Sequence, residues 1–480
     1  MAVKAVNFTI LNNGLGAVNP GGGQVMVVAG VSSTGTSNQI VESSNPADFV
    51  SAFGYGPLVE AAGFVANTSG NPVIAIKAAT VTAGSNTAVT HTGTGTSAVT
   101  VSGTPFDTYY AVVSVNVGGV VGTAGIQLAV SLDAGRTTWS TVNLGTATSY
   151  VVPNTGLTLN FGAGTLLVGD TYTFVSTEPK WDDAALVAAI QSLLGSSTAF
   201  KNILVVGDVA ASDAAAIDTE MSALFNKKRF ARALCNARDV LDGGTSSETS
   251  ATWQAAIIAD FSGFQSDRIS VAAGWYNVVS PYTQTQYRRP CSWVAAARDA
   301  QAAIGEDISA VALGSVKALP KPTIADGFVY FDSQANPSLD AARFLTLQNL
   351  FGEPGWYICN SNMMSAPGTD FSILPYCEVV DEACYVAYQF FAQKLGGSVR
   401  VDKTTGYILP ADANDLDARA TAAEQNALGA GVSSVYVKVN RTNNILSSKT
   451  LLATVGIIPL GYIQTINVTM TLVNPALVAV

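Results

Sequence analysis

Three acidic residues, Glu378, Asp381 and Glu382, are spaced so that they fall within one or two turns of a helix. Carboxylates paired in this way could act as general acid and base, one protonated and the other ionised. The alternative is an acidic helix face that meets solvent or a neighbouring subunit, which is the ordinary role of helix charge. We expect such an acidic surface here and assign no catalytic residue.

Other reactive groups are scarce. His91 is the only histidine, and it stands in "TAVTHTGTGTS" with no carboxylate nearby in the sequence. A serine or cysteine nucleophile would need it as a base, so we interpret it as a residue of a surface strand. No CxxC pair is present for zinc, and the glycines of "NNGLGAVNPGGGQ" do not match a nucleotide-binding loop. The sequence predicts no enzyme, no cofactor and no metal.

The five cysteines leave two interpretations open, because an odd number cannot all pair within one chain. Free buried thiols are one interpretation, since cysteine is commonly buried. Disulfides between subunits of a particle that leaves the cell are the other, with Cys291, Cys377 and Cys384 as the candidates.

Basic residues gather in two places along an otherwise acidic chain. They are Lys227, Lys228, Arg229 and Arg232 in one cluster and Arg288 and Arg289 in another. They could meet acidic faces of neighbouring copies or simply keep the protein soluble, and the sequence does not separate these roles.

The composition excludes some classes of protein. The 480 residues exceed the usual single domain, and they are 48% hydrophobic but only 12% charged. A net charge of −10 argues against general binding of nucleic acid. The start, "MAVKAVNFTILNNG", lacks the pattern of a signal peptide, and we expect no membrane-inserted segment.

Both ends alternate like strands. Residues 450–480 contain no charged side chain, and Ile466, Val468, Met470 and Leu472 alternate there with polar residues. Val6, Phe8 and Ile10 alternate in the same way near the start. Exposed strand edges of this kind aggregate unless they are paired, so we expect each end to add a strand to the sheet of another subunit.

The elements between these ends fall into distinct sections. Residues 81–177 carry only four charged side chains, and their short β-branched runs between glycine turns predict an inserted β-sandwich. Within it, "SLDAGRTTW" predicts a hairpin turn. Strands alternate with helices on either side of the insertion, which predicts a largely parallel sheet. The sequence thus predicts an α/β (α+β) core of two sections, divided as follows: N-terminal arm 1–20; first α/β domain 21–80 plus 178–305; inserted domain 81–177; second α/β domain 306–462; C-terminal arm 463–480.

The order of the later segments resembles the contractile tail sheath proteins of bacteriophages. The segments that carry the resemblance are "RRPCSWVAAARDAQAAIGEDISAVALG", "LDAARFLTLQNLFGEPGWYICNSN", "GTDF" and "VDEACYVAY", with "FGYGPLVEAAGFVANTSGNPVIAIKAA" at the front. In the family, the segment like "LDAARFLTLQNLFG" is a helix and the segment like "VDEACYVAY" is a second one. The insertion is a departure from minimal sheath proteins.

The resemblance implies a structural subunit of a phage contractile tail sheath. Such subunits polymerise as helical rings, six-fold by expectation, around a tail tube, and their donated arms link the rings. Contraction would drive the tube through the host envelope. The implied partners are other copies of the chain, the tube protein, and the baseplate and tail terminator proteins, in a virion tail assembled in the host cytoplasm. A surface-array protein or adhesin with a glycan-binding β domain is the alternative.

Overall fold

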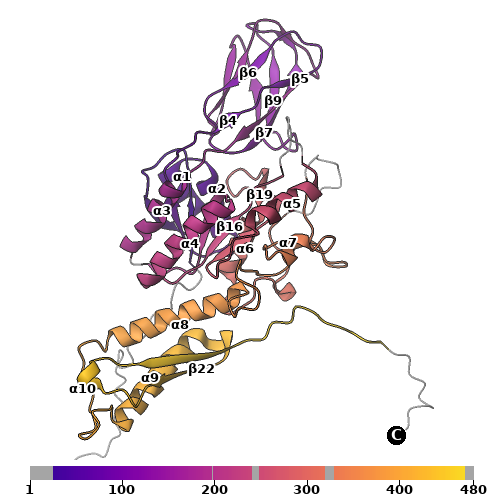
Figure 1. The fold of residues 1–480 in the computed structure, drawn as a ribbon. Coiled ribbons are helices and arrows are strands. Elements are labelled where there is room, and N and C mark those ends of the chain that lie inside the picture. Colours follow the sequence, from indigo (N-terminus) through magenta and orange to yellow (C-terminus); the bar gives the residue numbers. More distant parts are fainter. Residues whose placement is uncertain (1–24, 197, 241–247, 319–328, 471–480) are drawn as a thin grey trace, which may run out of the picture.

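A computed structural model of the chain describes residues 25–196, 198–240, 248–318 and 329–470. Figure 1 shows a β-rich region at the top, a sheet flanked by helices in the middle, and a unit of helices with a long hairpin below. From this lowest unit the chain continues as an extended segment that projects away from the body. The protein is of mixed α/β class, as predicted.

A six-stranded sheet forms the middle region, in the order β17-β16-β15-β1-β3-β2. Neighbouring strands are parallel except for β2, which runs antiparallel to β3, so the predicted largely parallel sheet is confirmed. All residues of β1 and β3 are buried, as strands covered on both faces require. The strands are β1 (Met26–Gly30), β2 (Ile40–Ser43), β3 (Val73–Lys77), β15 (Ile203–Asp208), β16 (Ala233–Asn236) and β17 (Ile269–Ala272).

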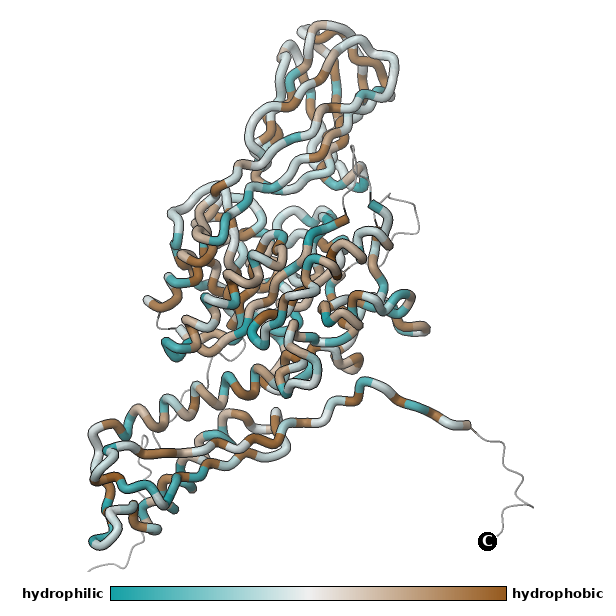
Figure 2. The backbone as a smooth tube through the Cα atoms, viewed as in Figure 1, coloured by the Kyte–Doolittle hydropathy of each residue, from teal (hydrophilic) through white to brown (hydrophobic). Residues whose placement is uncertain are grey.

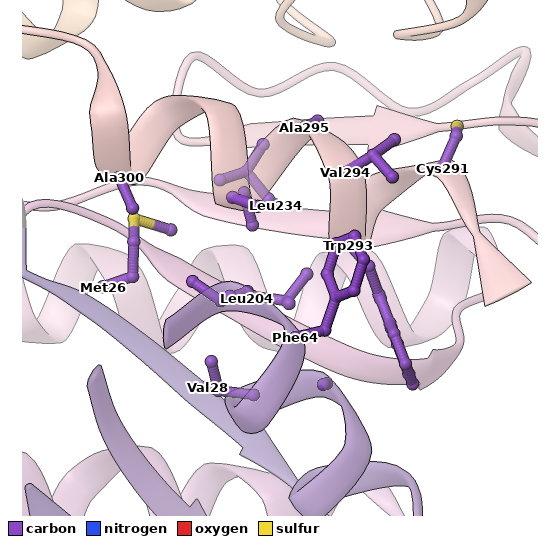
Figure 3. Packing of buried hydrophobic residues seen from close by; sticks show 14 of the residues in the cluster. Met26, Val28, Phe64, Leu204, Leu234, Cys291, Trp293, Val294, Ala295 and Ala300 are labelled. Atoms are coloured by element: carbon purple, nitrogen blue, oxygen red, sulfur yellow. The ribbon is translucent and has the colours of Figure 1, made fainter. Parts of the chain in front are cut away.

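Helices cover both faces of this sheet. The helices α1, α2 and α6 share one apolar cluster with it, and α3, α4 and α5 share the other. Figure 3 shows part of the first cluster, which contains Leu204 of the sheet, Phe64 of α2 and Trp293 of α6. The helices are α1 (Pro46–Phe53), α2 (Pro57–Ser69), α3 (Asp183–Gln191), η1 (Ser192–Gly195), α4 (Ala211–Asn226), α5 (Ser250–Phe261) and α6 (Cys291–Gln301).

Antiparallel sheets fill the stretch between β3 and α3. One has the order β10-β9-β7-β14-β4 with β5 added to β14, and another has the order β11-β12-β6. A single apolar cluster contains side chains of both, including Val113 and Leu159. The strands are β4 (Ser85–Asn86), β5 (Thr90–Thr92), β6 (Val99–Ser102), β7 (Tyr109–Val117), β8 (Gly119–Val120), β9 (Gln127–Ser131), β10 (Ser140–Asn143), β11 (Ser149–Val152), β12 (Leu157–Phe161), β13 (Thr165–Leu166) and β14 (Thr171–Thr177).

The hairpin turn predicted in "SLDAGRTTW" is confirmed. It joins the antiparallel strands β9 and β10. Asp133 closes the turn by accepting hydrogen bonds from the backbone N–H and the hydroxyl of Thr137, at 2.9 and 2.7 Å. Ala134 and Gly135 adopt positive φ angles there.

The helix expected over "LDAARFLTLQNLFG" is wrong beyond its first turn. The helix α7 covers only Ser338–Ala341, and Arg343 has a φ of 72°. Leu345 then exchanges backbone hydrogen bonds with Val271 and Ala273 beside β17, so tertiary pairing overrides the helical pattern. The remaining elements here are β18 (Trp275–Val279), β19 (Gln286–Pro290), η2 (Val311–Leu313), β20 (Leu347–Gln348) and β21 (Tyr357–Ile358).

The lowest unit packs two long helices against a two-stranded hairpin. The segments "SSVYVKVN" and "TLLATVGII" form the two strands of the hairpin, which pair with each other. The helix α8 joins this unit to the sheet region, because its first turn enters the core of the sheet and Phe390 enters the core of the hairpin. The elements are α8 (Leu374–Ala392), α9 (Pro410–Leu428), η3 (Gly429–Gly431), β22 (Val432–Val439), α10 (Ile445–Ser448) and β23 (Ala453–Pro459).

Candidate assembly site

The C-terminal arm, defined here as residues 463–480, exposes apolar side chains along its described part. Ile466, Val468 and Met470 are 76%, 73% and 91% exposed, and the polar residues between them are exposed as well. Residues 461–470 form no strand in this single chain, and apolar residues recur along the projecting arm (Figures 1 and 2). Leu472 lies outside the described residues, as do Val6, Phe8 and Ile10 of the N-terminal arm.

The hairpin β22–β23 has an outer edge on each strand. Val437 lies opposite Val455, and Val435 lies opposite Ile457. The N–H of Val437 points away from the hairpin, to Thr421 of α9. Directly opposite residues in an antiparallel pair share this orientation, so Val455 and Ile457 direct their backbone groups to the outer edge of β23. Among the described residues, none forms a hydrogen bond with the backbone of either one across this edge.

A shallow groove runs beside this edge of β23. Ala387 and Phe391 of α8, with Leu395 just beyond its end, line one side of it, and Ala453 and Val455 of β23 line the other. Lys394 and Lys449 also line the groove. Leu395 is 83% exposed. The groove therefore places unpaired backbone groups next to apolar side chains, which is the combination that an added strand with one apolar face requires.

The arm is attached firmly where it leaves the hairpin. The hydroxyl of Tyr462 donates a hydrogen bond to the carbonyl of Gly305 at 2.6 Å, and its ring lies 5.4 Å from that of Tyr376. Gly305 in turn contacts the backbone of Gly431 so closely that a Cβ on either glycine would collide with the other segment. These contacts direct the arm away from its own hairpin.

The predicted acidic surface on α8 is wrong. Glu378, Asp381 and Glu382 are only 3–6% exposed. Lys201 lies 2.7 Å from Asp299 and 3.2 Å from Glu378, and Asn202 donates hydrogen bonds to both carboxyl groups. The acidic residues of α8 therefore attach this helix to the sheet region, where their cationic partners come from distant parts of the chain.

Protonation keeps the buried cluster close to neutral. Burial, followed by the nearby charge of Asp299, raises the pKa of Glu378 well above its ordinary value. Burial opposes the charge on Lys201, but the two carboxyl groups outweigh it and raise the pKa of the lysine. A proton on Glu378 leaves Lys201 and Asp299 as the charged pair. The contacts of Glu378 with Lys201 and Asn202 hold α8 in place.

Each basic cluster contains an arginine that forms an ion pair within the chain, and two lysines of the first cluster are exposed. Arg232 forms two hydrogen bonds of 2.6 Å with Asp381, and Arg288 is bonded to Asp239. Lys227 and Lys228 are exposed. The sequence did not suggest that these two arginines pair with carboxylates of the same chain, because both acidic partners lie far away along it.

Arg289 joins the inserted β strands to the sheet region. Its guanidinium donates two hydrogen bonds, of 2.8 and 2.6 Å, to Asp107, and both side chains are 2% exposed. Two further carboxyl groups share this junction. Burial raises the pKa of Glu60 to about 7, and burial together with Asp107 raises that of Glu178 to about 8. A bidentate buried pair of this kind fixes the orientation of the insertion.

The candidate cysteines differ in their accessibility. Cys291 and Cys377 are fully buried, and burial raises the pKa of both thiols. Neither can reach a thiol of another subunit without opening the core. Cys384 is half-buried, and burial raises the pKa of its thiol to about 11. A disulfide between subunits through Cys384 stays a prediction.

His91 lies in β5, a strand as expected, but the fold brings a carboxylate to it. Its ring stacks on Tyr172 with centroids 4.4 Å apart, and its Nε2 lies 3.7 Å from Asp170. Asp170 also accepts hydrogen bonds from the backbone of Leu167, Thr94 and Gly95, which lower its pKa. The contact therefore belongs to a turn that closes one end of the β region.

Comparison with known proteins identifies the family. Residues 3–362 match the family described as DUF2586, N-terminal domain. The chain belongs to the DUF2586 family. No curated protein matches the sequence.

Two solved structures with the fold of this DUF2586 chain are contracted sheaths. The contracted helical sheath of the anti-feeding prophage matches with a TM-score of 0.50 and 12% identity, over 98% of this chain and 99% of that one. The contracted PVC sheath complex of an extracellular contractile injection system matches with a TM-score of 0.50 and 9% identity, over 98% of each chain. The resemblance to contractile tail sheath proteins is thereby confirmed at the level of the fold.

Within the described ranges, no three His, Cys, Asp or Glu side chains are grouped so that they could hold a metal ion. None of the helices in those ranges is long and apolar enough to cross a membrane.

A buried glutamate lies between α8 and α9 of the DUF2586 chain. Glu424 is 1% exposed, and neither of its carboxyl oxygens has a hydrogen-bond partner among the described residues. Burial and the nearby Glu382 raise its pKa from 4.5 to about 8. The side chain is therefore protonated in the folded protein at neutral pH.

Replacing Glu424 with glutamine is expected to weaken the pH dependence of stability. Between about pH 4.5 and 8 the unfolded chain releases the proton that the folded chain keeps, so the free energy of unfolding falls as pH rises. We expect Glu424→Gln to remove about 3–4 kcal/mol of this fall, measured by urea unfolding at pH 5 and pH 8. Glu353→Gln, at an exposed loop position, is the control. Equal slopes for wild type and Glu424→Gln would contradict the assignment.

Proposed function

We propose that this chain is the sheath subunit of a contractile tail or injection particle. Its role is structural: copies polymerise as helical rings around a tube, and donated terminal strands link the rings. The fold shared with contracted sheaths supports this proposal. The observation that carries it is the uncharged arm with exposed apolar side chains, in a chain whose hairpin leaves a strand edge open beside an apolar groove.

The donated strand would bind both through its backbone and through its apolar face. Its backbone would pair with the outward groups of Val455 and Ile457 on β23, at about 0.5–1.5 kcal/mol for each hydrogen bond. Its apolar face, with Ile466, Val468 and Met470, would cover the groove beside α8. Because each subunit gives and receives strands, these links repeat around and along the polymer and reinforce one another.

The proposed source of energy for contraction and the proposed partners follow from this structural role. The energy for contraction comes from repacked contacts between subunits, with the arms as connections that persist while the subunits move. Partners are other copies of the chain, the tube protein, and the baseplate and terminator proteins, in a particle that penetrates a host envelope. We keep the domain division proposed from the sequence, in which residues 81–177 form an inserted domain on the outside of the sheath.

Electron microscopy of the purified full-length protein at high concentration tests the proposal. Regular hollow tubes are the expected result. A compact monomer that persists under the same conditions would count against a sheath role. Binding of the protein to glycan arrays without tube formation would instead favour an adhesin.

A further inference from the structure

Lys201, Asp299 and Glu378 form a buried triad that the fold assembles from three places. Lys201 lies just before β15, Asp299 lies near the end of α6, and Glu378 lies near the start of α8. Their side chains are 2%, 0% and 2% exposed. The nitrogen Nζ of Lys201 lies 2.7 Å from Oδ1 of Asp299 and 3.2 Å from Oε2 of Glu378. An amine thus meets two carboxyl groups away from bulk water.

Hydrogen bonds hold the three reactive groups in fixed positions. Nζ of Lys201 donates to the backbone carbonyls of Asp299 and Ala302, at 3.0 and 3.2 Å. The amide of Asn202 donates to Oδ2 of Asp299 at 2.8 Å and to Oε1 of Glu378 at 2.7 Å. Apart from their ion-pair contacts with Nζ, Oδ1 of Asp299 and Oε2 of Glu378 have no hydrogen-bond partner among the described residues. The two carboxyl oxygens closest to Nζ are therefore free to exchange protons with it.

Burial gives the Lys201–Asp299 pair access to a neutral form. Burial opposes the charge on Lys201, although the two carboxyl groups outweigh it and raise the pKa of the amine, so the ion pair is the major form. Transfer of one proton from Nζ to Oδ1 converts this pair into a neutral amine and a carboxylic acid without changing the net charge. Groups held in a reactive orientation behave as if present at about 10⁵–10⁸ M, so even a minor neutral form can react.

We propose that Lys201 and Asp299 become joined by an intramolecular isopeptide bond, with Glu378 as the catalytic proton relay. Starting from the neutral pair, the lone pair of Nζ forms a bond to Cγ of Asp299. An electron pair of the C=O bond moves onto Oδ2, where the N–H of Asn202 stabilises it. Nζ gives one proton to Glu378, and the proton already on Glu378 passes to Oδ1. The Cγ–Oδ1 bond then breaks, the electron pair on Oδ2 restores the C=O bond, and one water molecule leaves.

The surroundings of Glu378 suit this relay. Burial, followed by the neighbouring carboxylate, raises the pKa of Glu378 well above its ordinary value, so the side chain has a proton to donate at neutral pH. A hollow bordered by Phe200, Phe230 and Tyr385 adjoins both Lys201 and Glu378. This hollow can receive the water that the reaction releases.

The bond would brace the sheet region of a single subunit. Lys201 and Asp299 are 98 positions apart in the chain, and the bond would tie the start of β15 to the end of α6. A covalent link across so long a loop restricts the unfolded chain, as a disulfide does. The bond would form within one folded subunit, so the inference does not depend on the proposed function.

Mass spectrometry of the denatured full-length protein tests the bond. Wild type is expected to be lighter than its sequence by one water molecule. Trypsin is expected to release a branched peptide that joins residues 181–227 to residues 299–317, because a modified Lys201 is not cleaved. Wild type at its full sequence mass would overturn the proposal. A loss of water found within the linear peptide 299–317 would overturn it as well, because that loss belongs to Asp299 alone.

Three substitutions within the triad separate the roles of its members. Lys201→Arg keeps the positive charge but removes the amine, so we expect no branched peptide. Glu378→Gln keeps the shape of the side chain but cannot relay a proton in this way, and we expect at least a tenfold lower yield of the bond. Asp299→Asn is expected to give the same branched peptide with loss of ammonia in place of water. Circular dichroism confirms that each variant is folded.

A fourth variant is the matched control. Lys180→Met alters an exposed lysine that lies 3.7 Å from Asp208, and it is expected to leave the loss of water unchanged. A loss of water that persists in Lys201→Arg would show that Lys201 is not the nucleophile. An undiminished yield in folded Glu378→Gln would overturn the role of Glu378 as the relay.

Discussion

Deletion of residues 464–480 is expected to yield a folded subunit that no longer forms tubes. The described residues of this segment make few contacts with their own chain, so the fold loses little when they are removed. The polymer loses several backbone hydrogen bonds and the burial of apolar side chains, each worth about 1.5–3 kcal/mol when fully buried. Circular dichroism checks the fold, and electron microscopy or sedimentation checks assembly.

A pair of point variants tests the same idea without removing the arm. Val468→Lys places a charge on the face that would enter the groove beside α8, whereas Asn467→Lys places it on the opposite, polar face. We expect Val468→Lys to reduce the yield of tubes at least tenfold and Asn467→Lys to leave most of it. Normal tubes from the truncated chain, or equal effects of the two lysines, would contradict strand donation by this arm.

Replacing Lys201 with methionine is expected to be the most destabilising single change in the folded subunit. The substitution leaves Asp299 and Glu378 buried without the cation that compensates them. Breaking a buried ion pair from one side typically costs about 3–5 kcal/mol. Because these groups join α8 to the sheet region, we expect the hairpin unit to loosen as well, with faster proteolysis between the two regions.

Urea unfolding followed by circular dichroism measures this effect. Lys180→Met is the matched control, since Lys180 is 52% exposed and lies 3.7 Å from Asp208, and exposed pairs contribute about 0–1 kcal/mol. Adding Asp299→Asn to Lys201→Met should recover part of the lost stability, because Asp299 is the carboxyl group closest to Lys201, at 2.7 Å, and its amide analogue needs no cation. A loss below about 1 kcal/mol for Lys201→Met would contradict the role of the cluster.

Local patterns in the sequence predicted several elements correctly. The alternation of strands and helices predicted the largely parallel sheet that contains β1 and β3, and the turn residues around Asp133 predicted the hairpin of β9 and β10. The alternation of residues 465–472 predicts a donated strand, and this stays a prediction. These signals are local: side-chain periodicity and turn chemistry depend on residues a few positions apart.

Other features depended on contacts between distant residues. The acidic residues of α8 look like a solvent-facing stripe in the sequence, but Lys201, Asn202 and Arg232 reach them across about 150–180 positions. The region after Ala341 reads as helix, but pairing beside β17 makes it extended. The sequence pattern alone could not show the burial of these acidic residues or the extended segment, because burial and strand pairing exist only once the chain has folded.

The sequence by itself determined that this chain carries an uncharged, alternating terminal segment in need of a partner, because that property lies in the order of its residues. Only the tertiary structure decided where such a segment could bind. Asp417 and Thr421 of α9 accept hydrogen bonds from the backbone of β22, whereas no described residue forms a hydrogen bond with the outer edge of β23 at Val455 or Ile457. Asp417 and Thr421 are four residues apart, and they reach the N–H groups of Val439 and Val437 only once α9 and β22 have packed side by side.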